Sequence, residues 1–340
     1  MKLDLEPFSC LMVRRNDQGQ VTAAVEQITV EQLPPGDVVI QVGCSSLNYK
    51  DAMACHGHPG VSGPLPNVPG IDCAGRVQAS TDPNFCPSDP VIVTGYGLGS
   101  EQWGGFARYV RVPSAWIVRR PPGWKSADAM TFGTAGFCAA QAVRALQQHQ
   151  VEPSTGPVAV TGASGAVGSL AVAILAHLGY KVSAITGKPE FADTLKQLGA
   201  HEVLPREELT NPGDKPLLAS RWAGAVDTVG NEMLAALLAS ISYRGCVSAC
   251  GLVGGPQFAT TLYPFLLRGV TLCGIDSAQC PMESRLEIWR LLAHAWRPAN
   301  LNLLTREITL SEVPAAANDM LAGRSTGRVL VRPFETATSN

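Results

Sequence analysis

The sequence predicts an α/β protein with two domains, a β-rich lobe and a doubly wound parallel sheet. The chain has 340 residues, more than a single ordinary core uses, and its hydrophobic content of 46% is that of a globular protein. Its first 120 residues or so are rich in Gly and Pro, whereas strand-like and helix-like patterns alternate beyond residue 157. These observations place the β-rich lobe first and the α/β lobe second.

The β-rich lobe is indicated by short apolar runs separated by turn residues. The runs 38–42 and 91–93 are typical of strands. Helical periodicity begins near Ser126 and continues over 127–148, where the turn Gly133-Thr134-Ala135-Gly136 interrupts it. We therefore expect the first part of this domain over 1–124.

The α/β lobe is indicated by six short apolar strands that alternate with helices. We expect strands over 158–161, 181–186, 202–204, 225–229, 246–251 and 270–275. Helices are expected over 167–178, 191–198 and 232–240, with a helical turn over 264–267. Such alternation predicts a parallel sheet with helices on both faces, over 125–278. The segment 279–340, with one strong helix and a strand-like run at 327–331, is expected to return to the first domain.

Charge and hydropathy exclude several classes of partner. The net charge is -2, the pI is near 6.3 and no run of Lys and Arg exceeds two residues, which indicates neither a nucleic acid nor an anionic membrane surface. The first ten residues carry charges and lack the apolar centre of a secretory signal. No stretch approaches the roughly 18 apolar residues of a membrane span. We expect a cytoplasmic protein that acts on a small neutral or anionic metabolite.

The ten cysteines are scattered along the chain, and no two form a C-x-x-C pair. This spacing argues against a zinc ribbon and against a disulfide scaffold. Most of the cysteines lie in apolar segments, where a thiol behaves as a small hydrophobic group. We interpret them as buried, inert thiols.

A glycine-rich turn joins the strand expected over 158–161 to the helix that follows it. Gly162, Gly165 and Gly168 are spaced as Gly-x-x-Gly-x-x-Gly, and Ala166 stands where a further glycine is often found. Glycines permit positive φ and close backbone approach, and the free N–H groups of a helix start favour a pyrophosphate. The pattern predicts a dinucleotide site, the alternative being a tight turn without a ligand.

The residues after the next strand indicate which dinucleotide binds. An enzyme that uses NAD has a carboxylate there, which accepts hydrogen bonds from the adenosine ribose hydroxyls. This chain has Thr186-Gly187-Lys188 instead. Thr186 and the amide of Gly187 can donate to a 2′-phosphate and Lys188 adds a positive charge, so NADPH is the expected cofactor. The alternative is that Lys188 is merely a solvated residue at a helix start.

Several motifs carry a resemblance to a known family. The chain resembles the quinone-oxidoreductase branch of the medium-chain dehydrogenase/reductase superfamily in Ser46-Leu47-Asn48-Tyr49-Lys50-Asp51, Val68-Pro69-Gly70-Ile71-Asp72, Trp103-Gly104-Gly105-Phe106-Ala107 and Gly133-Thr134-Ala135-Gly136-Phe137. Further blocks resemble the NADPH-dependent acrylyl-CoA reductase subfamily, namely 161–168, Leu204-Pro205-Arg206, 222–230 and Gly274-Ile275-Asp276-Ser277. The similarity runs over about 34–333.

The resemblance implies a GroES-like catalytic domain, a Rossmann domain, a homodimer and the reduction of acrylyl-CoA to propanoyl-CoA. Carried over by position, it implies cofactor contacts at Tyr49, Ser164, Gly165, Ala166, Val167, Thr186, Gly187, Lys188, Arg206, Leu252 and Ser277. Two segments depart from the family pattern. The loop 55–60 is less basic than in some relatives, which leaves the acyl-CoA contacts open, and Ser88-Asp89-Pro90 replaces the usual Gly-Asp-x turn. Four arginines are available for the phosphates of coenzyme A: Arg119, Arg120, Arg324 and Arg328.

The resemblance also bears on metal. Zinc alcohol dehydrogenases of the superfamily have a Cys where this chain has Asn48-Tyr49 and a His-Glu pair where it has Ile71-Asp72. Since catalytic zinc needs three protein donors, we expect no metal. His56 and His58 could bind a metal in principle, but we expect them to be solvated.

The expected reaction is hydride transfer from NADPH to the β-carbon of an α,β-unsaturated thioester, which needs hydrogen-bond donors near the thioester oxygen. Tyr49 is the leading catalytic candidate, as a donor to the nicotinamide ribose or the substrate. Asn48 and Asp51 could orient it, although Asp51 could equally be a helix N-terminal charge and Tyr49 a packing residue. Two other functions remain open, a quinone reductase on the same scaffold and a non-catalytic NADPH-binding protein.

Overall fold

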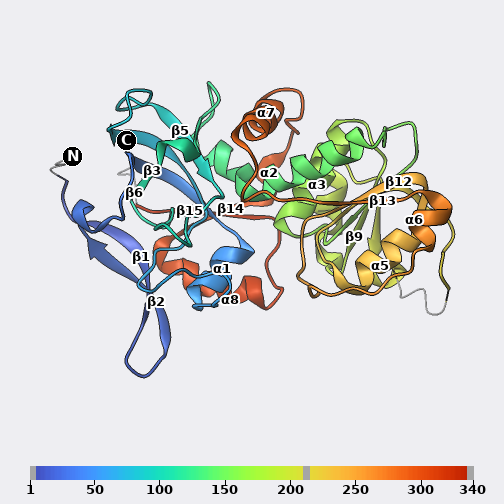
Figure 1. The fold of residues 1–340 in the computed structure, drawn as a ribbon, viewed down its shortest axis with the longest axis horizontal. Helices are drawn as coiled ribbons and strands as arrows, with labels where there is room; N and C mark the ends of the chain where they lie inside the picture. Colours follow the sequence, from blue (N-terminus) through green and yellow to red (C-terminus); the bar gives the residue numbers. More distant parts are fainter. Residues whose placement is uncertain (1–4, 210–214, 335–340) are drawn as a thin grey trace. The chain divides into compact units, whose positions relative to one another are not determined.

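The computed structural model describes residues 5–209 and 215–334, and the chain divides into two compact units. The first unit comprises Met1–Thr134, Ala278–Leu286 and Thr305–Asn340, and the second comprises Ala135–Ser277 and Glu287–Leu304. Each unit has its own sheet system, with the first drawn mainly in blue and the second mainly in green to orange (Figure 1). We describe them separately.

The first unit is built mainly on antiparallel strands, with one parallel pair. A hairpin pairs β1 (Phe8–Arg15) with β2 (Val21–Ile28), and a seven-stranded sheet has the order β14-β15-β3-β4-β5-β7, with β6 paired to β3. The strands of that sheet are β3 (Val38–Leu47), β4 (Asp72–Ser80), β5 (Pro90–Thr94), β6 (Tyr109–Val112), β7 (Ile117–Arg119), β14 (Thr305–Thr309) and β15 (Arg328–Arg332). Because β15 pairs with β3, the C-terminal segment completes the seven-stranded sheet that β3 begins.

Two helices, α1 (Tyr49–Cys55) and α8 (Val313–Leu321), belong to this unit. Short 3-10 turns lie at Val30–Gln32, Ser114–Trp116 and Leu310–Glu312. Side chains of α1 and α8 pack with β1 and β15 in one apolar cluster, and the strands β3 to β7 enclose another. The sequence indicated one strong helix beyond residue 279, whereas the structure has two, α7 (Met282–Ala293) and α8. The helix α8 has nine residues and buries Val313, Ala316 and Ala317.

The departure at Ser88 has a visible backbone consequence. Ser88 has φ of +75°, in the left-handed region where glycine carries no penalty. Its N–H donates to Val77 O over 2.8 Å, and its carbonyl accepts a bond from Arg76 Nη1 over 2.8 Å. This conformation is one that glycine adopts without penalty and serine adopts at a cost.

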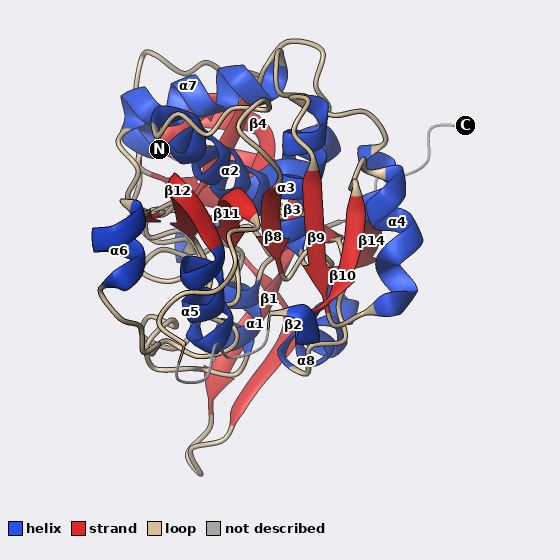
Figure 2. Ribbon diagram, turned by 90° about the vertical axis from the view of Figure 1, so that its right-hand side faces the viewer, coloured by secondary structure: helices blue, strands red, loops and turns tan. Residues whose placement is uncertain are grey.

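The second unit is a six-stranded parallel sheet with the order β10-β9-β8-β11-β12-β13. Figure 2 shows the strands β12, β11, β8, β9 and β10 of this sheet side by side. Their bounds are β8 (Val158–Thr161), β9 (Val182–Thr186), β10 (Glu202–Pro205), β11 (Trp222–Asp227), β12 (Ile241–Ala249) and β13 (Thr271–Gly274). All six expected strands are present, and the expected α/β class with a doubly wound parallel sheet is confirmed.

Helices cover both faces of this sheet (Figure 1). They are α2 (Ser126–Gln148, of which the second unit holds the part from Ala135), α3 (Ala166–His177), α4 (Ala192–Gln197), α5 (Asn231–Ser240) and α6 (Tyr263–Arg268), with 3-10 turns at Pro189–Phe191, Arg206–Glu208 and Leu301–Leu304. Apolar side chains of α5 and α6 pack on the strands in one buried cluster. The sheet order reverses at β8, whose neighbours are β9 and β11, so the turn after β8 lies at the position where such sheets bind ligands.

The expected interruption of the helix at 133–136 is present as a kink in α2. Gly133 has φ of +50° and ψ of -153°. A Cβ atom there would lie 2.5 Å from Asp72 Oδ2 and 2.7 Å from Arg328 Nη2. Only glycine accommodates both the dihedral angles and these neighbours.

Within the described residues, no helix has the length and apolar character needed to cross a membrane.

Candidate cofactor and catalytic site

The glycine turn after β8 holds the start of α3 close to the strand. Gly162 has φ of +58°, and the side chain of Thr228 occupies the space that a Cβ of Gly162 would need. A Cβ on Gly168 would collide with the carbonyl oxygen of Gly162, so the third glycine allows the helix to approach the turn. Gly165 is the N-cap of α3, and the first amides of the helix, at Ala166 and after, have no partner within the helix. The turn therefore presents donors and a positive helix end to an anion.

The end of β8 is fixed to β11 by a buried hydrogen bond. Thr161 Oγ1 donates to Asp227 Oδ1 over 2.6 Å, and Thr228 Oγ1 donates to Thr161 O over 2.9 Å. Asp227 also accepts the N–H of Gly230 over 2.8 Å, and burial raises the pKa of its carboxyl group. Asp227 is not among the residues that the sequence predicts for the site, because its partner Thr161 lies 66 positions earlier.

The expected 2′-phosphate residues are connected to the glycine turn. Thr186 Oγ1 donates to Ser164 Oγ over 2.9 Å and accepts the N–H of Lys188 over 3.1 Å. Thr186 and Ser164 are buried, and Lys188 is half-buried. Burial lowers the pKa of Lys188, and the carboxylate of Glu190 opposes this shift. The ends of β8 and β9 thus form one polar surface.

Arg206 adds a second cation at this surface. A Cβ atom on Gly187 would lie 3.0 Å from Arg206 Nε, so the guanidinium group packs against Gly187. Arg206 is exposed, and its Nε also contacts Glu207 Oε1 at 3.3 Å. The side chain is therefore held beside the 186–188 segment by a weak surface ion pair that another anion could replace.

The remaining expected contacts of this unit lie at the carboxyl side of the sheet. Ala166 and Val167 form the first turn of α3, Leu252 follows β12 with 60% of its side chain exposed, and Ser277 follows β13 and is half-buried. Because the carboxyl ends of parallel strands share one edge, the segments after β8, β9, β12 and β13 emerge on the same side. The cofactor residues that the sequence predicts in this unit therefore share one edge of the sheet.

Tyr49 lies in the first unit, at the first position of α1. Its side chain is 37% exposed, as a group that contacts a ligand must be. Asn48 is the N-cap, and its backbone N–H donates to Asp51 Oδ2 over 2.8 Å in a capping box. The helix start that carries Tyr49 is thus fixed by its two polar neighbours.

Asp51 is wholly buried and serves the backbone. Its Oδ1 accepts the N–H groups of Gly70 (3.1 Å) and Ile71 (2.8 Å). Burial and the charge of Asp72 raise the pKa of Asp51 to about 7, although the bonds from Ile71 and Asn48 oppose the shift. Of the two roles considered for Asp51, the helix N-terminal one is present in the structure.

A buried polar network lies beneath α1. Asp72 accepts hydrogen bonds from Ser46 Oγ (2.6 Å), Asn48 Nδ2 (2.8 Å) and the hydroxyl and amide of Thr134 (2.5 and 3.0 Å). Arg328 Nη2 lies 3.8 Å from Asp72 Oδ2, and neither side chain is exposed. Burial lowers the pKa of Arg328, while the charges of Asp72 and Asp51 raise it. In this network the buried negative charge of Asp72 and the buried positive charge of Arg328 compensate each other.

The structure corrects the expectation for two of the four arginines. Arg328 is fully buried, and Arg120 is buried with Nη1 bonded to Ser126 Oγ at 2.5 Å, so neither is available to a phosphate. Arg119 and Arg324 are exposed and paired with Asp89 and Asp319. The sequence shows that these residues are charged but not whether they are buried. Arg328 lies in a strand and points inward, where the buried Asp72 compensates its charge.

The residues at the zinc-ligand positions of the superfamily do not fit zinc. Asn48 has an amide in place of a thiol, and Asp72 is saturated by hydroxyl and N–H donors. His56 is tied to the protein rather than simply solvated, because Nδ1 contacts Ala52 O at 2.9 Å and Nε2 contacts Asn318 Oδ1 at 2.8 Å. These positions therefore do not supply the three protein donors of a catalytic zinc site.

A β-rich unit and a parallel sheet with a glycine-lined helix start define a dinucleotide-dependent dehydrogenase or reductase fold. Family models agree with this class: residues 34–122 match the alcohol dehydrogenase GroES-like domain and residues 166–293 match the zinc-binding dehydrogenase family. The chain belongs to the medium-chain dehydrogenase/reductase superfamily, which confirms the predicted resemblance.

Individual relatives match over nearly their whole length. The chain is 44% identical to "Acrylyl-CoA reductase AcuI" of Ruegeria pomeroyi over 325 residues, 95% of this chain and 98% of that protein. It is 44% identical to "Putative quinone oxidoreductase YhfP" of Bacillus subtilis over 326 residues, 96% of this chain and 98% of that protein. Among solved structures, Escherichia coli YhdH with bound NADPH has a TM-score of 0.92 at 44% identity, covering 96% of this chain and 100% of that one. The YhfP structure, with NAD bound, has a TM-score of 0.93 at 43% identity, covering 96% and 100%.

Proposed function

We propose that this protein is an NADPH-dependent reductase of the C=C bond of an α,β-unsaturated thioester, with acrylyl-CoA as substrate and propanoyl-CoA as product. The observation that carries the proposal is the 44% identity to an acrylyl-CoA reductase over 98% of that protein's length. Identity at this level over the full length supports a shared reaction more strongly than a shared fold does. The polar surface around Thr186 supports the choice of cofactor.

The preference for NADPH is argued from three groups. Thr186 and Lys188 are joined by a hydrogen bond of 3.1 Å, and Arg206 packs against the intervening Gly187. The segment 186–188 has no carboxylate that would repel a 2′-phosphate. The positive charges of Lys188 and Arg206 favour binding of this phosphate. The solved relatives contain different dinucleotides: the YhdH structure contains NADPH, and the YhfP structure contains NAD.

The residues of this chain would act by binding, orienting and donating hydrogen bonds. NADPH, when bound, supplies the hydride that reaches the β-carbon of the substrate, and the α-carbon then takes up a proton that Tyr49 would supply or relay. Ser164, Gly165, Ala166 and Val167 would hold its pyrophosphate at the start of α3, and Leu252 and Ser277 would contact it from the ends of β12 and β13.

Tyr49 would donate its hydroxyl hydrogen to the nicotinamide ribose or to the thioester oxygen, where negative charge develops. Asn48 and Asp51 act as positioning residues in this proposal, because their hydrogen bonds fix the first turn of α1. Asn48 is 9% exposed and Asp51 is 0% exposed. Such burial supports a role beneath Tyr49 rather than in contact with the substrate.

We further propose a cytoplasmic homodimer that forms through the edge of the parallel sheet. In the described residues β13 pairs with β12 alone, so its other edge has open backbone groups. Beside it, four apolar side chains of the α6 segment are half or more exposed, which we call the α6 patch: Leu262, Tyr263, Leu266 and Leu267. An exposed apolar patch next to an open strand edge is typical of a subunit interface.

A quinone reductase is the second candidate, favoured by the name of YhfP. It would use the same cofactor residues and differ in the acceptor. A non-catalytic NADPH-binding protein is the remaining alternative.

One set of assays separates these functions. Oxidation of NADPH would be followed with acrylyl-CoA, crotonyl-CoA and a quinone, each repeated with NADH and with a chelator. We expect the highest kcat/KM with acrylyl-CoA and NADPH, unchanged by the chelator. Activity with the quinone alone would support the second candidate, and tight NADPH binding without turnover across the panel would support the non-catalytic one.

A further inference from the structure

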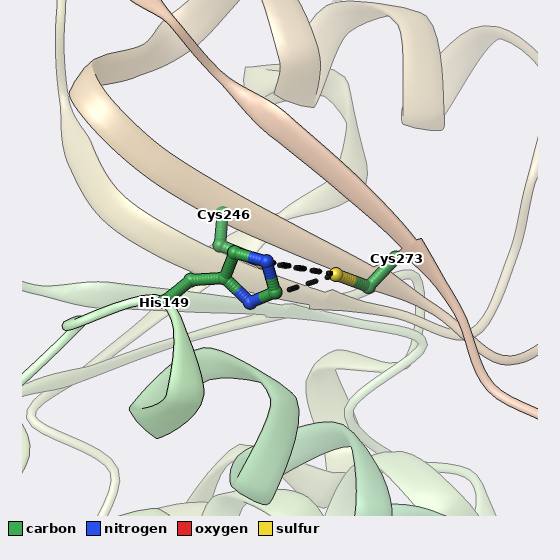
Figure 3. A group of neighbouring side chains, drawn as sticks. All are labelled: His149, Cys246 and Cys273. Carbon is green, nitrogen blue, oxygen red and sulfur yellow. Dashed lines mark hydrogen bonds between the residues drawn. The ribbon is translucent and has the colours of Figure 1, made fainter.

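A group of three potential metal ligands lies in the second unit, outside the residues assigned above to the cofactor and the substrate. His149 follows the end of α2, Cys246 lies in β12 and Cys273 lies in β13 (Figure 3). We propose that these three side chains form a binding site for a thiophilic divalent metal ion, with Zn²⁺ as the expected occupant. The proposal does not depend on the proposed function.

Two of the three spacings between the donor atoms are close to those of a zinc site. The sulfur atoms of Cys246 and Cys273 are 3.7 Å apart, and Cys273 Sγ lies 3.7 and 3.8 Å from the Nδ1 and Nε2 atoms of His149. One donor atom from each residue lies within 4.8 Å of the others. A tetrahedral zinc with Zn–S near 2.3 Å and Zn–N near 2.0 Å holds two sulfurs about 3.8 Å apart and sulfur and nitrogen about 3.5 Å apart. The two sulfurs already have this spacing, and the imidazole has to turn so that Nε2 faces them.

The imidazole of His149 is oriented as metal ligands usually are. Nδ1 lies 2.9 Å from the carbonyl oxygen of Ala145, which can only accept a hydrogen bond. Nδ1 must then carry the proton, and Nε2 has a free lone pair. A histidine ligand that donates its other N–H to a backbone carbonyl is the usual arrangement around zinc. This hydrogen bond is an observation separate from the distances to sulfur, and it too indicates that His149 can act as a metal ligand.

The site combines a buried base with an open entrance. Cys246 is buried, Cys273 is half-buried and His149 is exposed, so an ion can enter from the His149 side. Binding replaces two S–H bonds by two Zn–S bonds and releases two protons, and the neutral imidazole gives the third bond. Three protein donors leave the fourth position of a tetrahedron to water or to a small exogenous ligand.

The ion would connect three elements that the fold brings together from distant parts of the chain. It would link the end of α2 to β12 and to β13, which is the edge strand of the sheet. Among residues 5–209 and 215–334, this is the one group of three or more metal-ligating side chains so closely spaced. An ion that binds only the folded arrangement stabilises it.

The test uses the reduced, metal-free full chain with Co²⁺ and Zn²⁺ as probes. We expect one Co²⁺ per chain with thiolate-to-metal charge-transfer absorption, displacement of Co²⁺ by Zn²⁺, and a thermal midpoint that rises with Zn²⁺ concentration. The variants C273S and H149Q should each lose more than about a hundredfold in Zn²⁺ affinity, beyond the 10- to 100-fold typical of changes outside the ligand set. The matched control C86S, which removes an exposed thiol of the first unit, should bind as the wild type does.

NADPH binding to each variant reports whether the second unit is folded, so a misfolded variant is recognised and replaced by H149A. The proposal is overturned if the reduced wild type binds no Co²⁺, if bound Co²⁺ shows no thiolate absorption, or if folded C273S and H149Q bind Zn²⁺ with wild-type affinity.

Discussion

Arg328 Nη1 donates a hydrogen bond to Asn48 Oδ1 over 3.2 Å, although 280 positions separate the two residues. The same guanidinium group donates to the carbonyl oxygens of Thr131 and Met130, and its Nη2 lies 3.8 Å from Asp72. A residue of the last described strand thus holds the N-cap of the helix that presents Tyr49. The network links the stability of the first unit to the position of the leading catalytic candidate.

Replacing Arg328 by Met should destabilise the first unit strongly. The change leaves the charge of Asp72 buried without its cation, which costs about 3–5 kcal/mol in comparable cases. The measurement is urea unfolding followed by a probe of that unit. R324A is the matched control, because Arg324 forms an exposed ion pair with Asp319 and its loss should cost less than about 1 kcal/mol. Equal effects of R328M and R324A would show that the buried network contributes no more than a surface pair.

Replacing Tyr49 by Phe should lower kcat with acrylyl-CoA by at least about tenfold, equivalent to roughly 1.4 kcal/mol. The ring is retained while the donor to the ribose or thioester oxygen is lost. Steady-state kinetics with NADPH and acrylyl-CoA give the result, and Y243F, at a tyrosine of the second unit that is 70% exposed, is the control. Unchanged kinetics in Y49F would rule out a direct chemical role for the hydroxyl group.

Introducing a carboxylate after β9 should weaken the preference for NADPH. In G187D the new acid lies between Thr186 and Lys188 and close to Arg206 Nε, where it repels a 2′-phosphate and can accept bonds from ribose hydroxyls. We expect the ratio of kcat/KM for NADPH over NADH to fall by at least about tenfold, or roughly 1.4 kcal/mol. K181A removes a lysine at the opposite end of the same strand and should leave the ratio unchanged. If G187D kept the wild-type ratio, the 2′-phosphate would not bind at residues 186–188.

The stability of the wild type should contain a contribution from Asp51 that decreases as the pH rises. Its pKa is raised from 3.8 to about 7 by burial and by Asp72. Between these values the folded chain holds a proton that the unfolded chain has released, so this contribution falls as the pH rises from about 4 to about 7 and is constant above. Unfolding free energies of the wild type and of D51N would be measured across this range. The free energy of the wild type, relative to that of D51N, should fall as the pH rises toward 7. A difference independent of pH would contradict the raised pKa.

The proposed dimer should dissociate when a charge enters the α6 patch. Leu266 is 75% exposed, so L266E leaves the monomer fold intact while burying a charge in any interface formed there. Sedimentation measurements should show a dimer for the wild type and a monomer for L266E. L303E, at a leucine of the same unit that is 41% exposed, is the control. A monomeric wild type, or a dimeric L266E, would exclude this surface.

The sequence predicted the second unit closely because its signals are local. The apolar run before Gly162 and the glycine spacing determine a strand, a turn and a helix start within about ten residues. Thr186 and Lys188 were identified in the same way, since the residues after a strand in such a sheet face the ligand edge. The hydrogen bond between Thr186 and Ser164 adds the contact that joins these two local signals.

Tertiary structure decided what depends on pairs distant in the chain. Arg328 looked like a cation available to phosphate and is instead a buried partner of Asn48 and Asp72. Cys246 and Cys273 lie 27 positions apart without any motif, and only the pairing of β12 with β13 brings their sulfur atoms to 3.7 Å.

The sequence by itself thus determined the fold class and the glycine turn after β8, because hydrophobic period and glycine spacing act over a few residues. The folded chain alone decided which charged and sulfur-bearing side chains are buried together. Burial and pairing between distant residues are properties of the packed structure, and no local pattern encodes them.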